Sequence, residues 1–230
     1  MNKKVYCIWV GGTPMSSTRQ HSLDVLRKVL GVPVELITDD TLEDYILPNE
    51  PFHPAYTYLS STHKADYIRC YIMHHYGGGY TDIKLSYHSW LPYFLTLEDH
   101  PTKWLQGYRE ISPHTFAEPN EEFKEYKDIM KSQWYNLAGC CAFICKPYSP
   151  FTYEWINSVH ACLDLIFDTI QKNPATDTRD YIGKELHNGL ISTYPLKWPM
   201  ILGSIFAPLC IKYTSNILLE LPPPHFWDYM

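Results

Sequence analysis

The sequence predicts an α/β fold that begins as a parallel, doubly wound sheet, and three observations support this. Residues 5–10 form a short continuous apolar run, which is typical of a strand buried on both faces. A segment with helical spacing of its apolar residues follows, and a second strand-like run covers residues 32–38. This strand–helix–strand order favours a parallel sheet, in which ligands bind beyond the carboxyl ends of the strands.

The first connection starts where Gly11 and Gly12 end the first strand. Ser16 or Ser17 suits the N-cap of the following helix, and Gly31 ends that helix. The second strand tolerates Pro33 because this residue stands at its start, where a missing N–H does least harm. We expect a short helix over 41–46 and an irregular connection over 48–59.

The next segment gives the clearest helical pattern of the chain, over residues 62–76. Ala65, Ile68 and Ile72 make its apolar stripe. The three glycines at 77–79 are expected to end the helix as a turn, because glycine tolerates the left-handed conformation. A strand over 80–85 should then enter the core.

The second half of the chain has weaker patterns. We expect strands over 103–107 and 137–144, the latter central because it is small and apolar, and a loop over 110–130. Helices are expected over 150–171 and 183–192. Neither an internal repeat nor a linker is recognisable, so the whole chain, 1–230, is predicted to be one domain.

Composition narrows the class of protein. The chain has 230 residues, 45% of them hydrophobic, and a net charge of -6, which fits a globular protein and does not fit a nucleic-acid surface. The seven cysteines show no CxxC pair, so we interpret them as buried free thiols in a reducing compartment. We find no signal peptide or membrane span, and expect a soluble, cytoplasmic protein.

Charged residues cluster around the third predicted strand. Asp66 and Arg69 are three apart on the helix before it and therefore share a face. Asp82 lies within the strand, where an unpaired buried carboxylate would be costly. The structural alternatives are a surface salt bridge for the first pair and a solvated strand end for Asp82.

The run from His63 to Arg69, followed by Tyr76-Gly77-Gly78-Gly79-Tyr80-Thr81-Asp82, resembles the DXD-containing sugar-binding region of glycosyltransferases. The similar family includes capsular-polysaccharide and yeast mannosyltransferases and, more distantly, the clostridial glucosylating toxins. Ile8-Trp9-Val10-Gly11-Gly12 also resembles the family's first strand and nucleotide loop. The resemblance is strong over 60–84, looser over 4–90, and implies a single GT-A, Rossmann-like domain with a mixed, mainly parallel sheet flanked by helices.

The resemblance also implies roles for particular residues. Asp66 and Arg69 would bind the donor sugar or its phosphates, and Asp82 would be the first aspartate of the motif, facing the ribose and a metal-bound diphosphate. Trp9 would lie near the nucleotide base, and Gly11 would allow close backbone approach. Residues 1–90 would form the nucleotide-sugar-binding half and 91–230 the acceptor-side half.

The motif departs from the family at its last position, where Lys84 replaces the second aspartate. Residues i and i+2 of a strand share a face, so Lys84 would point toward Asp82. Three alternatives follow. A divalent cation, Mn²⁺ or Mg²⁺, is held by Asp82, the diphosphate and a distal residue such as His225; or Lys84 replaces the metal; or the protein is a binder without activity.

The expected function is transfer of a sugar from a nucleotide diphosphate sugar, a UDP-sugar first, to a glycan or glycoprotein, with retention of configuration as in the related families. A polysaccharide pathway of bacterial or viral origin would suit such a chain. The sequence identifies no catalytic residue; Glu185 and Asn188 are candidates to face the site, because they are three apart in the helix expected over 183–192. The rivals are a non-catalytic nucleotide-sugar or glycan-binding protein and a cysteine hydrolase, for which Cys140 and Cys141 are poorly placed in an apolar strand.

Overall fold

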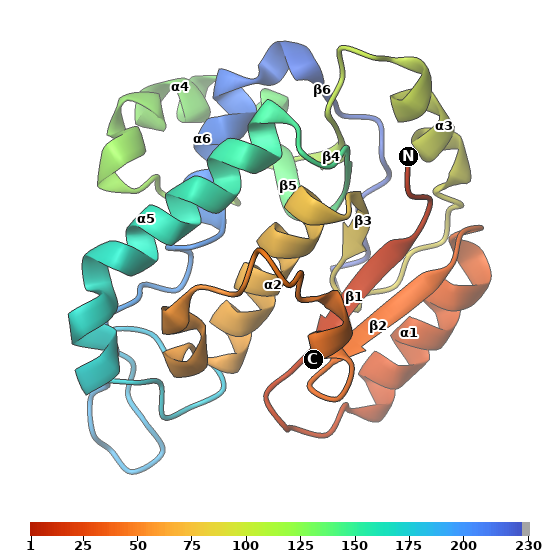
Figure 1. Cartoon of the computed structure of the whole chain (residues 1–230). Helices are drawn as coiled ribbons and strands as arrows, with labels where there is room; N and C mark the ends of the chain where they lie inside the picture. Colours follow the sequence, from red (N-terminus) through yellow and green to blue (C-terminus); the bar gives the residue numbers. More distant parts are fainter. Residues whose placement is uncertain (227–230) are drawn as a thin grey trace.

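A six-stranded mixed sheet forms the centre of the computed structural model, which describes residues 1–226 (Figure 1). The strand order is β2-β1-β3-β5-β4-β6. The strands are β1 (Val5–Trp9), β2 (Val34–Thr38), β3 (Gly78–Thr81), β4 (Leu105–Arg109), β5 (Ala138–Cys145) and β6 (Ile217–Leu218). Parallel pairing joins β1 to β2 and β3, and β4 to β6, whereas β5 is antiparallel to β3 and β4. The predicted mixed, mainly parallel α/β sheet is therefore confirmed.

Helices flank this sheet. Within residues 1–226 the α-helices are α1 (Ser17–Val29), α2 (Ser61–His75), α3 (Leu91–Asp99), α4 (Lys127–Ser132), α5 (Pro150–Lys172) and α6 (Gly203–Lys212). Short 3₁₀ helices are η1 (Leu42–Tyr45), η2 (Pro54–Tyr58), η3 (Glu121–Tyr126), η4 (Trp134–Asn136) and η5 (Thr214–Asn216). No helix in this part of the chain combines the length and the apolarity that a membrane span requires.

Both faces of the sheet are covered, which explains why β1 is apolar throughout. Val5 and Cys7 pack with Leu23 of α1 and Phe94 of α3, whereas Tyr6 belongs to the core that contains α2, α5 and α6. Figure 1 shows α1 and α3 on one side of the sheet and α2 and α5 on the other. Because alternate side chains of a strand point to opposite faces, a strand between two helical layers needs an unbroken apolar run.

The first part of the chain follows the sequence prediction closely. Ser16 caps α1 by accepting a hydrogen bond from the backbone N–H of Arg19, and β2 begins just after Pro33. The short helix expected over 41–46 is the 3₁₀ helix η1, and the connection over 48–59 contains η2. Ser60 caps α2, which has the predicted length.

The glycine run differs from its prediction. Gly77 and Gly78 both have positive φ, +60° and +93°, and Gly78 and Gly79 already belong to β3. A Cβ on Gly79 would lie 3.0 Å from Val5 and 3.1 Å from Trp90, so this position needs glycine for close packing. The strand consequently starts two residues earlier than expected and ends at Thr81, so Asp82 and Lys84 lie beyond it.

The second half differs more. Strands β4 and β5 and helix α5 occur where they were predicted, but η3 and α4 form within the stretch expected to be a loop. The helix predicted over 183–192 is wrong. Gly183 and Gly189 have positive φ there, and an isolated bridge joins Glu185 to Ile191. Neither Glu185 nor Asn188 lines the cleft described below.

Candidate functional site

The sheet has a topological switch point beside β1. The chain leaves β1 through α1 to reach β2 on one side, and leaves β2 through α2 to reach β3 on the other. Because α1 and α2 pack on opposite faces, a crevice opens at the carboxyl ends of β1 and β3. A cleft of about 800 Å³ lies there, within the range of roughly 300–1,000 Å³ usual for small-molecule sites.

Asp82 stands at the carboxyl end of β3 and lines this cleft. The backbone N–H of Lys84 donates to the Asp82 carbonyl oxygen at 2.7 Å, which is the i to i+2 bond of a γ-turn. The turn brings the Lys84 ammonium back to the Asp82 carboxylate, with 2.8 Å between Nζ and Oδ2. The predicted juxtaposition of the two side chains exists, but a turn and not a strand produces it.

Arg69 connects the two aspartates that the sequence singled out. Its Nη2 lies 3.3 Å from Asp66 Oδ1 and 3.2 Å from Asp82 Oδ1, and its Nη1 donates to the Cys140 carbonyl oxygen. The guanidinium stacks on the ring of Tyr80, 4.0 Å from its centroid. Arg69 is only 5% exposed, so this is a buried network and not the surface salt bridge of the structural alternative.

The two aspartates are driven to opposite protonation behaviour. Burial raises the pKa of Asp66 to about 7, against a smaller opposite influence of Arg69. Burial would also raise the pKa of Asp82, but the charges of Arg69 and Lys84 outweigh it and lower this pKa to about 2. Asp82 is therefore a fixed anion between two cations, whereas Asp66 exchanges a proton near neutral pH.

The end of β1 brings Trp9 to the cleft, whereas Gly11 does not line it. Trp9 ends β1, lines the cleft and donates its indole N–H to the Thr13 carbonyl oxygen at 2.7 Å. Gly11 has φ +99°, and a Cβ there would lie 1.9 Å from Ser61 Oγ at the start of α2. The N–H groups of Gly11 and Gly12 both donate to the Asp39 carboxylate. The predicted close backbone approach at Gly11 is thus toward α2.

Sequence reasoning missed several side chains that line the cleft, because they come from segments far apart in the chain. Arg19 reaches it from α1 and donates to the Ile83 carbonyl oxygen at 2.6 Å. Cys140 and Cys141 come from β5, and Cys141 Sγ lies 3.4 Å from Lys84 Nζ. All seven cysteines were expected to be buried. The other five are, but Cys140 and Cys141 are only half-buried.

The cleft lining has more basic than acidic side chains, whereas the whole chain is negatively charged. The basic side chains that line it outnumber the acidic ones, although the whole chain carries 19 Lys and Arg against 25 Asp and Glu. The basic members are Arg19, Arg69, Lys84 and Arg179, and the acidic ones are Asp66, Asp82 and Glu110. A lining of this kind favours an anionic ligand.

His225 lies apart from these residues. Its backbone N–H donates to the Leu85 carbonyl oxygen, its ring contacts Tyr87, and it does not line the cleft. The next residue, Phe226, does approach the site, with its ring centroid 5.2 Å from Lys84 Nζ. The end of the described chain therefore passes beside Lys84, but it brings aromatic carbon and not an imidazole.

The surroundings of Asp82 do not fit a divalent cation. Oδ1 accepts hydrogen bonds from Arg69 and Tyr80, and Oδ2 accepts one from Lys84. An ion beside the Lys84 ammonium would be repelled by roughly 4 kcal/mol per unit charge pair at about 4 Å and moderate dielectric. The part of the chain that the structure describes holds no group of three His, Cys, Asp or Glu side chains able to bind a metal.

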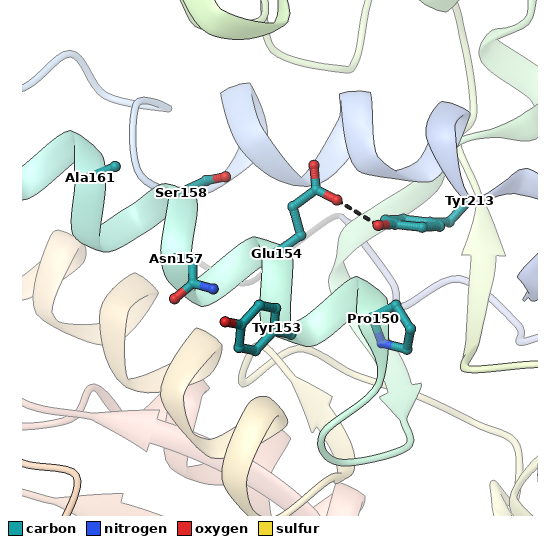
Figure 2. Close-up of a pocket in the computed structure, with 7 residues that line it drawn as sticks. All are labelled: Pro150, Tyr153, Glu154, Asn157, Ser158, Ala161 and Tyr213. Atoms are coloured by element: carbon teal, nitrogen blue, oxygen red, sulfur yellow. Dashed lines mark hydrogen bonds between the residues drawn. The ribbon is translucent and has the colours of Figure 1, made fainter.

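A second hollow, of about 440 Å³, runs along the outer side of α5 (Figure 2). Its one carboxylate, Glu154, is already engaged, because it accepts hydrogen bonds from Lys212 and from the Tyr213 hydroxyl. A carboxylate held by a lysine and a tyrosine therefore occurs here as well as at Asp82. At Glu154 it lies on a helix surface and not at a strand end. It offers a matched control for variants of the cleft.

The chain matches no protein-family model and no curated protein. Among solved structures it is similar to one titled "PaToxG Glycosyltransferase", with a TM-score of 0.41 and 14% sequence identity. The similarity covers 74% of this chain and 64% of that one, so the chain spans less than two thirds of the length of that structure. At this level of similarity, function has to be inferred from the geometry of the cleft.

Proposed function

We propose that this chain is a glycosyltransferase that moves a sugar from a nucleoside diphosphate sugar to a hydroxyl group of an acceptor. The observation that carries the proposal is the position of Arg69 and Lys84 on Asp82, inside a cleft at the switch point of the sheet. Such a site offers cations to a diphosphate and hydrogen-bond acceptors to sugar hydroxyls within one concave space. A UDP-sugar is the proposed donor.

The transfer needs the bond between the anomeric carbon and the diphosphate oxygen to break. That oxygen keeps the bonding electron pair and gains one negative charge, while the acceptor oxygen bonds to the anomeric carbon and loses its proton. Cations fixed in advance near the departing oxygen stabilise the charge that develops there. Lys84 is fixed in this way by the γ-turn and by its ion pair with Asp82.

Two aromatic residues of the cleft suit different parts of the substrates. Trp9, at the end of β1, presents an aromatic face beside which we place the nucleotide base. Trp198 also lines the cleft and is 44% exposed, with Tyr181 in edge-to-face contact at 5.9 Å. Exposed aromatic rings suit the apolar faces of sugars, so we place a glycan acceptor, free or on a glycoprotein, beside Trp198.

The proposal is tested by nucleotide release from a panel of UDP- and GDP-sugars, with and without Mn²⁺. We expect release with at least one donor, and a loss of about a hundredfold in Asp82→Asn, which frees Lys84 from its position. Glu154→Gln removes a carboxylate with equivalent partners outside the cleft and should leave the rate unchanged. The anomeric proton of the first product, followed by NMR, checks the proposed retention of configuration.

Two outcomes would contradict this assignment. Nucleotide binding without any release, in every condition of the panel, would favour the non-catalytic nucleotide-sugar-binding protein instead. Equal losses in Asp82→Asn and Glu154→Gln would show that the cleft is not the site of the reaction.

A further inference from the structure

Lys84 stands where the resemblance places a second metal-binding carboxylate, and its surroundings are those of a ligand-binding cation. The side chain is buried, yet it lines the cleft, and its ammonium contacts Asp82 Oδ2 and Cys141 Sγ. A salt bridge at the molecular surface would leave the ammonium in water. Here the protein holds a charge at the base of a concave site, at a position set by the backbone turn.

Arg19 supplies a second cation from the opposite side of the crevice. It belongs to the first turn of α1, lines the same cleft, and is held by the carbonyl oxygen of Ile83, the residue between Asp82 and Lys84. This contact is with a neutral oxygen, and the guanidinium is positively charged at every pH of interest. The turn from Asp82 to Lys84 therefore contains one cation, Lys84, and its Ile83 carbonyl oxygen positions a second, Arg19.

We infer that Lys84 and Arg19 hold the donor's diphosphate in place of a divalent cation, and that this chain binds nucleoside diphosphates without metal. A divalent ion would bring two positive charges to the diphosphate, and these two side chains bring the same number. Asp82 is then a positioning residue, because it aims Lys84 and does not bind a metal. This inference rests on the proposed function, whose donor contains the diphosphate.

The direct test is binding of UDP and GDP to the unmodified chain, measured by calorimetry in EDTA and again with Mn²⁺. We expect at least one nucleotide to bind in EDTA, with a Kd that changes by less than about threefold when Mn²⁺ replaces the chelator. Binding that requires Mn²⁺ would overturn the metal-free site while leaving the proposed function intact. Failure of both nucleotides to bind in either condition would overturn both.

A reciprocal variant sharpens the test. Lys84→Asp restores the Asp-x-Asp pattern of the similar family, so its nucleotide affinity in EDTA should fall by about tenfold or more, as expected for one charge-assisted contact. Added Mn²⁺ should recover part of that loss. Lys212→Asp, which removes the corresponding ion pair at Glu154, should bind nucleotide as the unmodified chain does in EDTA and in Mn²⁺.

Two further measurements guard against an unfolded variant. Thermal unfolding of Lys84→Asp establishes that it is folded, and Lys84→Met keeps the apolar stem of the side chain without adding a charge. Lys84→Met should lose affinity in EDTA and gain nothing from Mn²⁺, because it has neither the ammonium nor a second carboxylate. Affinity in EDTA equal to that of the unmodified chain in either Lys84 variant would overturn the inference.

Discussion

Asp66 and Asp82 show how one buried arginine gives two carboxylates different properties. Both approach Nη2 of Arg69, at 3.3 and 3.2 Å. Asp82 has Lys84 as a second cation and Tyr80 as a neutral donor, whereas the burial of Asp66 is opposed by Arg69 alone. The resulting difference in pKa separates a permanent anion from a group that titrates near neutral pH.

The Asp66 carboxyl should make stability depend on pH. Its pKa in the folded chain, about 7, exceeds its ordinary value of 3.8, so its favourable contribution is complete below about pH 4 and is lost as the pH rises through 7. The unfolding free energy of the unmodified chain should therefore fall relative to that of Asp66→Asn by about 4 kcal/mol across this window. Urea unfolding of both chains at several pH values measures the difference.

Asp82 affects stability at lower pH than Asp66 and does not disturb this measurement. Its lowered pKa makes a contribution that is present above its ordinary value and is lost only as the pH falls toward 2. A difference between the unmodified chain and Asp66→Asn that stays constant from pH 4 to pH 8 would contradict the titration assigned to Asp66.

The two cleft cysteines should report on ligand binding. Burial raises the pKa of Cys70 and Cys145, but a hydrogen bond from Cys140, with a smaller influence from Lys84, lowers the pKa of Cys141. Iodoacetamide should therefore label Cys141 first, since the thiolate is the reactive form. A bound nucleotide at tenfold its Kd should slow that labelling about tenfold, because only unbound chain reacts.

Mass spectrometry of the labelled peptides measures both rates. Cys162, which is buried on α5, provides the internal control and should label only after unfolding. Equal labelling of Cys141 with and without a bound nucleotide would place the nucleotide outside the cleft.

The connection between α2 and β3 passes through two glycines with positive φ, Gly77 and Gly78. Gly77 has φ +60°, and a Cβ there would lie 2.4 Å from Pro147 Cδ and 2.8 Å from its backbone nitrogen. Gly183 also has positive φ, but nothing lies within 4 Å of its Cβ position. The two positions share the backbone cost and differ in packing.

Gly77→Ala should therefore destabilise the chain more than Gly183→Ala. The left-handed backbone costs about 1–2 kcal/mol at both sites, and overpacking adds roughly 1–3 kcal/mol at Gly77 alone. Chemical denaturation of the two variants measures the difference. Similar losses would mean that the loop before Pro147 moves aside and that the turn does not fix the start of β3.

Elements with a local signature were predictable. The caps of α1 and α2, the amphipathic pattern of α5 and the apolar run of β1 each lie in a short stretch of sequence. Two missed helices lack such signatures: α6 is buried almost throughout and contains Pro208, and α3 is a short helix with Pro92 in its first turn. An element buried on every side shows no amphipathic stripe.

Most of the cleft residues that were predicted are close together in the sequence. Asp66, Arg69, Asp82 and Lys84 come from one stretch and meet in one cleft with Trp9. Arg19 and Cys141 reach the same cleft because β1 and β5 both lie next to β3, a pairing that the sequence does not reveal. The Asp82–Lys84 contact was expected for the wrong reason, since a γ-turn replaces the predicted strand there.

The molecule as a whole gathers positive charge into the switch-point cleft of an otherwise acidic chain. That arrangement brings together residues from both the predicted nucleotide half and the predicted acceptor half. This arrangement suits an anionic donor beside the basic residues and an acceptor beside Trp198, and it requires no metal-binding cluster.

A structure with UDP bound tests this account most directly. We predict that the diphosphate lies in the cleft within hydrogen-bond distance of Lys84 and Arg19, with the base toward Trp9. Nucleotide bound elsewhere, for instance in the hollow along α5, would contradict it.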